Sequence, residues 1–257
     1  MGSVYHAPVT DALELVALGA GAAFGGPTEA QSGYLVRGGG SAICMDMGSG
    51  VFNRLLGHID PVELDGVVIS HRHPDHIADI LAARVYMAHG PGLGHPLDIY
   101  GPPGLHDALA GVAGDEPWAG IRMHDLAPGG GEFTIGALTV RHAEVPHLPP
   151  THAFRVEHGG ASVTYGADCA PNDALPELAQ GSDVLLAECT FGTGEIPEGV
   201  PHLNARAVGE IARRARVGRL ILVHGYPGVD RDAAVTEATA VFGGPVEWAR
   251  EGATITP

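Results

Sequence analysis

Short apolar runs of the kind that form buried β-strands recur along the chain. Turn residues bound many of them, as expected of strands in a packed sheet. Two further stretches, Pro128–Gly131 and Gly90–Gly94, are rich in turn residues and predict surface turns or loops. The ten predicted strands are Leu13–Leu18, Gly33–Val36, Ala42–Met47, Gly66–Ser70, Leu97–Tyr100, Leu138–His142, Ala153–Val156, Ser162–Tyr165, Val184–Ala187 and Leu220–Val223.

Helical patterns lie between some of these runs. Apolar residues at helical spacing follow Asp75, and Gly90 marks the end of that pattern; these residues are Ile77, Ile80, Leu81 and Val85. A second helix is predicted over Ala205–Arg216, with Asn204 as its N-cap and Gly218 as its end. A third is expected around Asp232–Phe242. Strands and helices joined by short connections predict an α/β domain built in layers.

Composition is consistent with one large domain. The chain has 257 residues, 45% of them hydrophobic, which argues against disorder and is enough for a substantial core. No repeat, low-complexity tract or linker divides it, so we expect a single domain over residues 1–257. The 39 glycines and 20 prolines indicate many turns rather than a helical bundle.

The charge balance limits the partners. The net charge is −16, with only 14 Lys and Arg, whereas nucleic-acid affinity rests mainly on basic residues that neutralise phosphates. This weighs against a large nucleic acid and favours a small-molecule substrate. No apolar stretch predicts a transmembrane helix, and residues 1–6 lack the features of a signal peptide. The cysteines Cys44, Cys169 and Cys189 are odd in number and widely spaced, so we expect buried free thiols and a cytoplasmic location.

The densest polar stretch is His71-Arg72-His73-Pro74-Asp75-His76, directly after a predicted strand. It matches the pattern H-x-H-x-D-H, and imidazole and carboxylate are ligands that borderline metals such as zinc accept. A loop that is rich in histidine by chance is the alternative, because the chain holds 15 histidines.

Other potential ligands lie in the predicted strands or shortly after them: Asp46, His147, Asp168, Glu188 and His224. Any one of these alone is better explained as an ordinary core or surface residue. Strand ends that gather at one edge of a sheet would bring their side chains together on rigid elements. The recurrence of the pattern therefore favours a site.

On these residues the chain resembles the metallo-β-lactamase superfamily, in particular its ribonuclease Z-like and cyclic-nucleotide-phosphodiesterase-like branch. The likeness runs from Leu18–Ala22 and Ser32–Val36 to the last strands, with the motifs in family order. It implies an αββα four-layer sandwich, a fold of the α/β class, with a dinuclear metal centre at one edge.

The resemblance also implies a set of metal ligands. The first metal would be held by His71, His73 and His147, the second by Asp75, His76 and His224, and Asp168 would bridge them. Asp46 would orient a ligand histidine or the backbone of the motif. The cofactor would be two divalent ions, with zinc expected and manganese or iron as alternatives. Such a pair, about 3.5–4 Å apart, can activate water and stabilise both oxygens of an in-line displacement.

Two further matches concern catalysis. The segment 187–191 resembles the His-Glu-Ala-Thr-Phe segment of the branch, and His202 resembles the histidine that opens its next helix. The likeness implies that His202 protonates a phosphate oxygen or the leaving group, that Glu188 orients His202, and that Asp75 helps to hold the attacking group. A buried hydrogen-bonded carboxylate and an ordinary loop histidine remain the alternatives for the pair.

The chain also departs from the branch. Ala187 stands where the branch has histidine, and only 20 residues separate His147 from Asp168, where ribonuclease Z carries its tRNA-binding arm. We therefore expect a phosphodiesterase that acts on a small substrate such as a cyclic nucleotide. A lactone, thioester or sulfate-ester hydrolase is the alternative, followed by a ribonuclease Z-type tRNA endonuclease and a metal-stabilised binding protein. A homodimer would be the commonest oligomer.

Three loops and one histidine have open roles. The Gly19–Gly26 loop either presents backbone N–H groups to a ligand or is a tight turn between strands. The loops Gly90–Gly94 and Gly114–Gly120, and the side chain of His152, are candidates for shaping a pocket.

Overall fold

The computed structural model describes residues 11–113 and 118–257. The expectation for the first six residues, and the part of the 114–120 loop formed by residues 114–117, lie outside this range. None of the helices in the described range has the length and apolar character needed to cross a bilayer.

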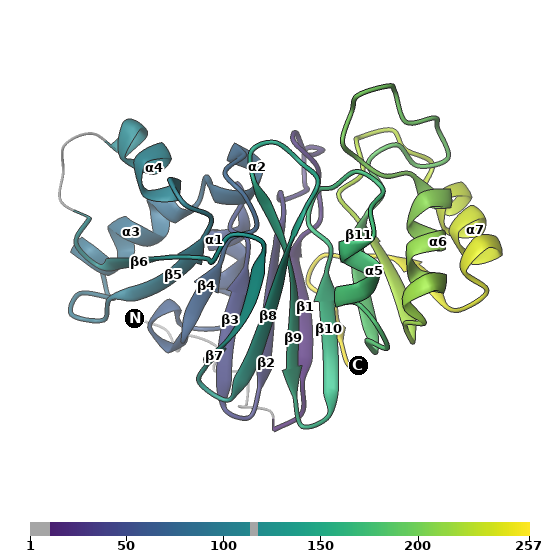
Figure 1. The fold of residues 1–257 in the computed structure, drawn as a ribbon. Helices are drawn as coiled ribbons and strands as arrows, with labels where there is room; N and C mark the ends of the chain where they lie inside the picture. Colours follow the sequence, from purple (N-terminus) through teal and green to yellow (C-terminus); the bar gives the residue numbers. More distant parts are fainter. Residues whose placement is uncertain (1–10, 114–117) are drawn as a thin grey trace.

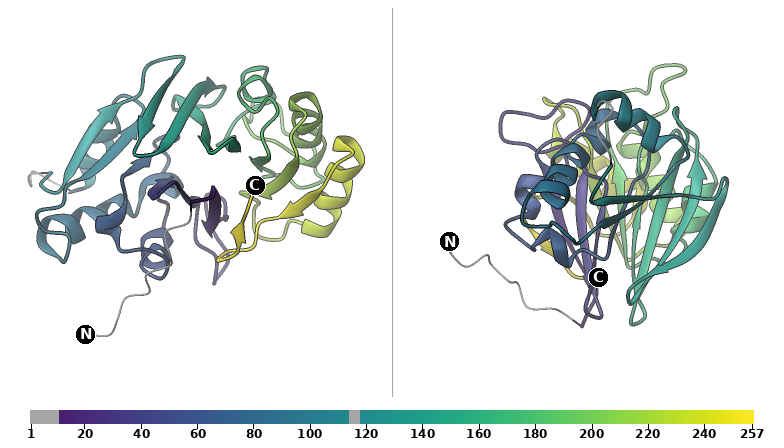
Figure 2. Two further views of the ribbon diagram at one scale, coloured as in Figure 1. Left: turned by 90° about the horizontal axis from the view of Figure 1, so that it is seen from below. Right: turned by 90° about the vertical axis from the view of Figure 1, so that its left-hand side faces the viewer.

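Within the described residues, the strands form two seven-stranded sheets that lie face to face (Figures 1 and 2). The first sheet has the order β14-β1-β2-β3-β4-β5-β6, with β14 Thr254–Ile255, β1 Glu14–Gly19, β2 Gly33–Gly38, β3 Ser41–Met45, β4 Gly66–Val68, β5 Leu97–Gly101 and β6 Ile121–Asp125. The second has the order β13-β12-β11-β10-β9-β8-β7, with β13 Val246–Trp248, β12 Arg219–Val223, β11 Val184–Glu188, β10 Ala161–Tyr165, β9 Thr151–His158, β8 Leu138–Val145 and β7 Gly130–Ile135.

Each sheet is antiparallel on one side and parallel on the other. Strands β1 to β3 pair antiparallel and β3 to β6 parallel. Strands β7 to β10 pair antiparallel and β10 to β13 parallel. The parallel strands point their carboxyl ends toward one edge of the sandwich, where loops can gather side chains from distant parts of the sequence.

Both faces of the sheets are buried, which explains the continuous apolar runs in the sequence. In β1, Leu15 and Ala17 pack between the sheets, whereas Val16 and Leu18 pack under the helices of the first sheet. The second sheet alternates in the same way, with Leu186 in the central core and its neighbours in β11 facing the helices. Two sheets with helices on both outer faces form the αββα sandwich, as predicted.

The helices divide between the two outer faces (Figure 1). Residues of α1, α3 and α4 pack on the first sheet, and residues of α5, α6 and α7 on the second. The bounds are α1 Val51–Leu55, η1 Pro61–Glu63, α2 Pro74–Ile77, α3 Ile80–His89, α4 Leu105–Ala113, α5 Ala174–Leu178, α6 Ala205–Ala215 and α7 Arg231–Phe242.

All ten predicted strands are present, with ends shifted by a few residues. Strands β6, β7, β13 and β14 were not predicted. The turn predicted over Pro128–Gly131 is wrong in its second half, because Gly130 and Gly131 already pair with β8. The loop at Gly90–Gly94 is confirmed.

The predicted helices need two corrections. The apolar pattern after Asp75 covers two helices, α2 and α3, because the Asp79 N–H donates to the Met47 carbonyl at 3.0 Å instead of to the Asp75 carbonyl one turn earlier. Asn204 caps α6 by accepting the Ala207 N–H at 3.0 Å, as predicted. That helix ends at Ala215, and its C-cap is Arg216 in a left-handed conformation rather than Gly218. The three cysteines are free and buried, as expected.

Candidate metal centre

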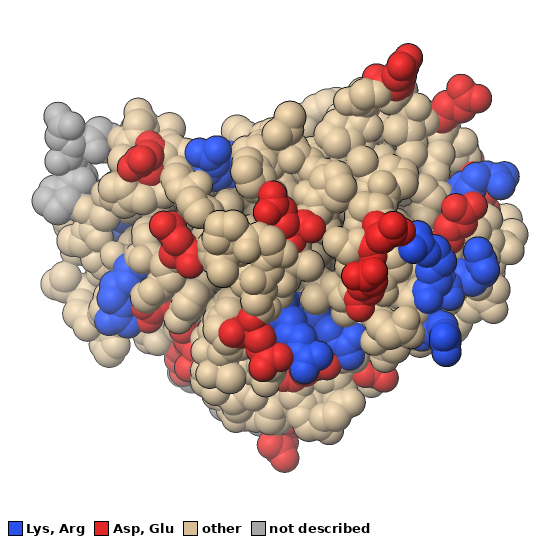
Figure 3. Space-filling model, in the orientation of Figure 1, with Lys and Arg blue, Asp and Glu red and all other residues tan. Residues whose placement is uncertain are grey.

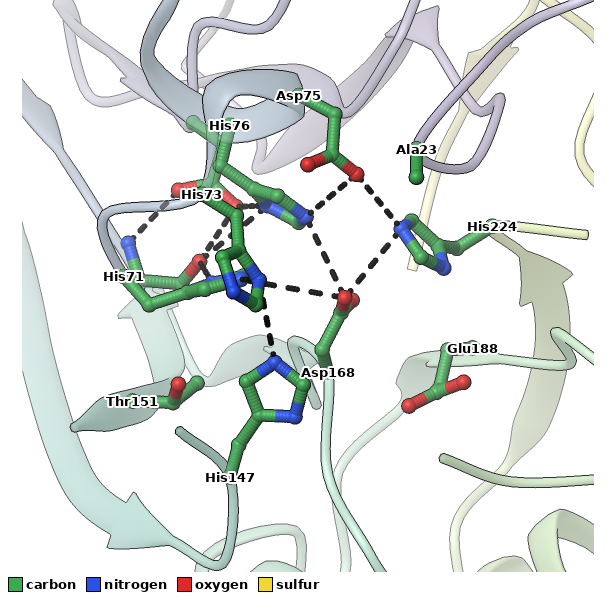
Figure 4. Close-up of polar contacts among 12 residues, drawn as sticks. Ala23, His71, His73, Asp75, His76, His147, Thr151, Asp168, Glu188 and His224 are labelled. Atoms are coloured by element: carbon green, nitrogen blue, oxygen red, sulfur yellow. Dashed lines mark hydrogen bonds and ion pairs between the residues drawn. The ribbon is translucent and has the colours of Figure 1, made fainter. Parts of the chain in front are cut away.

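Seven side chains that could bind metal ions converge at one edge of the sandwich (Figure 4). They come from the loops that follow β4, β8, β10 and β12 and from the start of α2. Two groups have ligand atoms within 4.8 Å of one another: His71, His73, His147 and Asp168, and Asp75, His76, Asp168 and His224. All seven residues predicted as metal ligands therefore lie together.

The first group consists of three imidazoles around one carboxylate. Nε2 of His71 lies 2.9 Å from Nδ1 of His73, which lies 3.3 Å from Nε2 of His147. The Asp168 Oδ2 atom is 3.9 Å from His71 Nε2. Such spacing brings three nitrogen donors and one oxygen donor around a common point, as a borderline divalent metal requires.

The second group surrounds the other side of the same carboxylate. Nε2 of His224 lies 3.2 Å from Asp75 Oδ2 and 3.4 Å from Asp168 Oδ2. Nε2 of His76 lies 3.5 Å from Asp75 Oδ2 and 3.6 Å from Asp168 Oδ2. Asp168 is thus the residue shared by both groups, where a bridging ligand would be.

Unpaired buried atoms provide an independent test of whether this site fits cations. His76 is fully buried and Asp168 is 2% exposed, yet His76 Nε2 and Asp168 Oδ1 have no hydrogen-bond partner among the residues that the structure describes. A buried polar atom without a partner costs about 1–3 kcal/mol, so such atoms are rare unless a ligand satisfies them. Both atoms belong to the proposed ligand groups, and the donor set therefore fits a metal centre.

Hydrogen bonds behind the ligands fix which ring nitrogen faces the centre. Nδ1 of His76 donates to Asp46 Oδ2 at 2.6 Å. Nδ1 of His71 donates to the Ser70 hydroxyl at 3.0 Å, and that hydroxyl donates to Asp46 at 2.7 Å. Because the Nδ1 atoms carry the protons, the Nε2 lone pairs of both rings remain free for metal.

Other ligands are held in the same way. His147 Nδ1 donates to the carbonyl of Pro201 at 3.1 Å, and His224 Nδ1 donates to the Thr190 hydroxyl at 3.0 Å. The Tyr165 hydroxyl adds a 2.8 Å hydrogen bond to Asp46. Asp46 was predicted in an orienting role, and its contact with His76 agrees with that role. Sequence reasoning did not assign Ser70, Tyr165 or Thr190, although each adjoins a recognised motif.

The backbone at this edge adopts conformations that bring the side chains inward. Asp46, Ala167 and His224 have φ angles of 59°, 52° and 53°, in the left-handed region that non-glycine residues rarely adopt. The His224 N–H donates to the Ala20 carbonyl at 2.8 Å and so holds this turn. A Cβ on Gly48 would lie 2.0 Å from the Asp75 carbonyl oxygen, so glycine is required there.

The two groups differ in their electrostatics. Burial lowers the pKa of His71 well below its usual value and also lowers the pKa of His73. Burial would raise the pKa of Asp168, but the electrostatic attraction to His224 and His76 holds it well below the ordinary value. Burial likewise would raise the pKa of Asp75, but the neighbouring His224 and His76 lower it instead. The carboxylates are therefore ionised, and the centre carries the negative charge that bound cations would compensate.

A third group lies beside the second. Nδ1 of His202 donates to Glu188 Oε1 at 2.9 Å and lies 3.9 Å from Asp168 Oδ2. The Cys169 N–H donates to Glu188 at 2.8 Å, and the Thr190 hydroxyl also donates to it. Glu188 is 1% exposed, and it accepts hydrogen bonds from all three donors.

The surroundings of His152 and of the Gly19–Gly26 loop decide between the roles left open for them. His152 is 1% exposed and its Nδ1 lies 3.1 Å from that of His142, so it is a core residue and the expectation that it lines a pocket is wrong. In the Gly19–Gly26 loop, the N–H groups of Ala20, Gly21 and Gly26 donate to Glu251, Ala30 and Glu29. Those three N–H groups therefore belong to the fold and are unavailable to a ligand.

Known proteins are similar to this chain over most of its length. A family model described as a beta-lactamase superfamily domain matches residues 41–225. The probable metallo-hydrolase YhfI of Bacillus subtilis is 32% identical over 244 residues, covering 93% of this chain and 98% of that protein. A ribonuclease Z of Mycobacterium bovis is 31% identical over 246 residues, covering 84% of this chain and 87% of that protein.

Solved structures agree with the fold. The crystal structure of YhfI superposes with a TM-score of 0.86 at 29% identity, covering 96% of this chain and all of that one (100%). The short form of human tRNase Z shares the fold with a TM-score of 0.77 at 21% identity, covering 95% of this chain and 98% of that one. The chain therefore belongs to the metallo-β-lactamase superfamily of metal-dependent hydrolases, alongside YhfI and the ribonuclease Z homologues.

Proposed function

We propose that this hydrolase is a dinuclear phosphodiesterase that cleaves a small phosphodiester such as a cyclic nucleotide. The observation that carries the proposal is the pair formed by Glu188 and His202, next to the shared carboxylate of Asp168. Burial alone would lower the pKa of His202, but the hydrogen bond and charge of Glu188 raise it. A histidine that stays protonated near neutral pH is suited to donate a proton to a departing alkoxide.

The residues would divide the work of an in-line displacement. Two divalent ions, with zinc as our choice and manganese or iron as alternatives, would supply an acidic water and neutralise charge on the phosphoryl oxygens. Asp75 would accept a hydrogen bond from the attacking water and so direct its oxygen at phosphorus. As the bond from phosphorus to the leaving oxygen breaks, the proton on His202 would pass to that oxygen. Glu188 would hold the His202 ring in place throughout.

The surface supports a small substrate. Basic and acidic side chains are interspersed on the face in Figure 3, and several arginines are paired with carboxylates, including Arg141 with Glu132 at 2.7 Å and Arg214 with Asp173 at 2.6 Å. The stretch between His147 and Asp168 is occupied by β9 and β10, which leaves no length for an arm that grips tRNA. Ion pairs and a net charge of −16 both disfavour a long polyanion.

The test uses two phosphodiesters that differ in their need for an acid. Adenosine 3′,5′-cyclic phosphate expels a ribose alkoxide, whereas bis(p-nitrophenyl) phosphate expels a stabilised phenolate that leaves without a proton. For metal-loaded protein we expect His202→Ala to lower kcat about 10²–10⁴-fold on the cyclic nucleotide and much less on the activated diester. His106→Ala, on the exposed side of α4, is the matched control and should change neither rate.

Two results would contradict the proposal. Turnover of a lactone or thioester by a protein inert toward both diesters would indicate an acyl hydrolase. Equal loss on both diesters in His202→Ala would show that His202 is structural. His73→Ala should abolish all turnover, and metal content measured on the same samples distinguishes lost chemistry from lost metal.

A further inference from the structure

An aromatic cluster extends from the catalytic pair to the surface. The Phe191 ring lies 6.3 Å from His202, and the Tyr226 ring lies 6.1 Å from Phe191. Phe24 stacks on Tyr226 with ring centroids 5.2 Å apart and planes at 19°. Ring centroids about 4.5–7 Å apart are typical of aromatic contacts, so these rings contact one another in sequence. We call these three residues, Phe24, Tyr226 and Phe191, the aromatic shelf.

The outer end of the shelf is exposed. Phe24 is 61% exposed, although a large apolar ring gains most by burial. Only one face of a ring can stack on Tyr226, so the other face of Phe24 has room for a further planar group. A single exposed apolar residue needs no explanation on its own. Here the exposed ring is the last member of a stack that begins beside His202.

Backbone pairing fixes the shelf relative to the metal ligands. Gly21 and Gly225 form a parallel bridge, which joins the loop of Phe24 to the segment that carries His224 and Tyr226. The Gln31 side chain donates to the Ala23 carbonyl at 2.8 Å, and the Gly26 N–H donates to Glu29 at 2.9 Å. The backbone is therefore held both before and after Phe24. The Ala20 carbonyl accepts the His224 N–H at 2.8 Å, which places the start of this loop against the second ligand group; Ala23 of the same loop is labelled in Figure 4.

We propose that the aromatic shelf stacks the base of the substrate, so that the enzyme prefers nucleoside diesters to diesters that lack a base. This inference rests on the proposed function, because it concerns the same candidate site. Aromatic side chains bind bases through their π-faces with little dependence on sequence, and each stack typically strengthens binding about 5- to 100-fold. A base held on Phe24 or Tyr226 would leave the phosphodiester of the same nucleotide directed toward the ligands and His202.

Kinetics with and without a base test the proposal. Adenosine 3′,5′-cyclic phosphate is compared with the cyclic phosphate of propane-1,3-diol, which has the same six-membered ring and no base. We expect Phe24→Leu to raise KM about 5- to 100-fold for the first and to leave the second unchanged, with kcat retained. Phe24→Tyr keeps an aromatic face and should restore the wild-type KM. Val85→Ala removes another exposed apolar side chain, 52% exposed on α3, and is the control.

A binding measurement separates this proposal from the proposed function. Calorimetric titration of metal-loaded protein with adenosine 5′-monophosphate and with ribose 5-phosphate should show tighter binding of the nucleotide, and Phe24→Leu should remove the difference. If no diester is cleaved, the phosphodiesterase assignment fails, and this difference in affinity alone decides whether the shelf binds bases. Equal affinity for the nucleotide and for ribose 5-phosphate would overturn the proposal that the shelf binds a base. The proposal would also fail if Phe24→Leu changed only the oligomeric state.

Discussion

Replacing Asp46 by asparagine tests how far the outer hydrogen bonds control the metal centre. Asp46 is fully buried and accepts hydrogen bonds from His76 Nδ1 at 2.6 Å, from the Tyr165 hydroxyl at 2.8 Å, and from the Ser70 hydroxyl and N–H, both at 2.7 Å. Asparagine tolerates the φ angle of 59° better than most residues, so the backbone should survive the change. The substitution therefore changes hydrogen bonding with little change in shape.

The expected loss of stability follows from counting the hydrogen-bond donors that face Asp46. An amide offers one oxygen where the carboxylate offers two, so in either orientation its NH2 group faces at least one donor from Ser70. A buried unsatisfied donor costs about 1–3 kcal/mol. We expect metal-free Asp46→Asn to lose about that much unfolding free energy. His76 also loses its negatively charged partner, and losses of this kind weaken metal binding about 10- to 100-fold.

Competition with a chromophoric chelator measures the metal affinity, and urea unfolding of the metal-free protein measures the stability. Tyr165→Phe removes one of the four hydrogen bonds to Asp46 and no charge, so its effect on affinity should be smaller than that of Asp46→Asn. Asp46→Asn protein that binds both metals with wild-type affinity would refute the claim that Asp46 orients His76.

Three other predictions follow from the structure. Removal of metal by a chelator should lower the melting temperature, by an amount that depends on the metal concentration, since ligand at 100 times its Kd adds about 2.7 kcal/mol of stability. An unchanged melting curve would contradict a metal centre at this buried site. Burial and the neighbouring His152 lower the pKa of His142 to about 4, so the folded state resists a proton that the unfolded chain accepts near pH 6.5. The stability that neutral His142 contributes should be fully present above pH 6.5, and the unfolding free energy should fall by about 2–3 kcal/mol as the pH drops toward 4. Urea unfolding at pH 7 and 5 should show a smaller loss of unfolding free energy in His142→Phe than in the wild type. Gly48→Ala should destabilise the fold and weaken metal binding, because its Cβ would meet the Asp75 carbonyl. Gly111→Ala on α4, whose Cβ would have no described atom within 4 Å, should instead raise the unfolding free energy by about 0.5–1 kcal/mol; thermal melts of both variants check the contrast.

The metal-ligand arrangement could be predicted because its residues are marked by local sequence. His71 to His76 form a dense motif, and Asp168 and His224 each follow an apolar run that became a strand. Strands buried on both faces give continuous apolar runs, which is why all ten predicted strands were found. The unpredicted β6 lacks this signal, since its central residues Arg122 and Met123 are exposed or half-buried.

Other features could not be predicted because they depend on contacts between distant segments. The break between α2 and α3 follows from the hydrogen bond of the Asp79 N–H to the Met47 carbonyl, which the spacing of apolar residues does not reveal. The hydrogen bond from Tyr165 to Asp46 spans 119 positions. Phe24 and Tyr226 are still farther apart in the sequence, and only the pairing of their loops brings the rings together.

The candidate metal ligands and the residues around them thus belong to different parts of the fold. This division decides from which residues the substrate can be inferred. The metal ligands lie at strand ends, where unusual backbone angles at Asp46 and His224 and hydrogen bonds behind the rings leave little freedom. A centre built this way can activate water for attack on phosphorus or on an acyl carbon, so the ligand motif alone does not select the reaction. Selection must come from residues outside the ligand set. For this chain we propose that those residues are His202, as the proton donor to a poor leaving group, and the rings that lead from it to Phe24. Substitutions there should change which esters are cleaved while both metals stay bound.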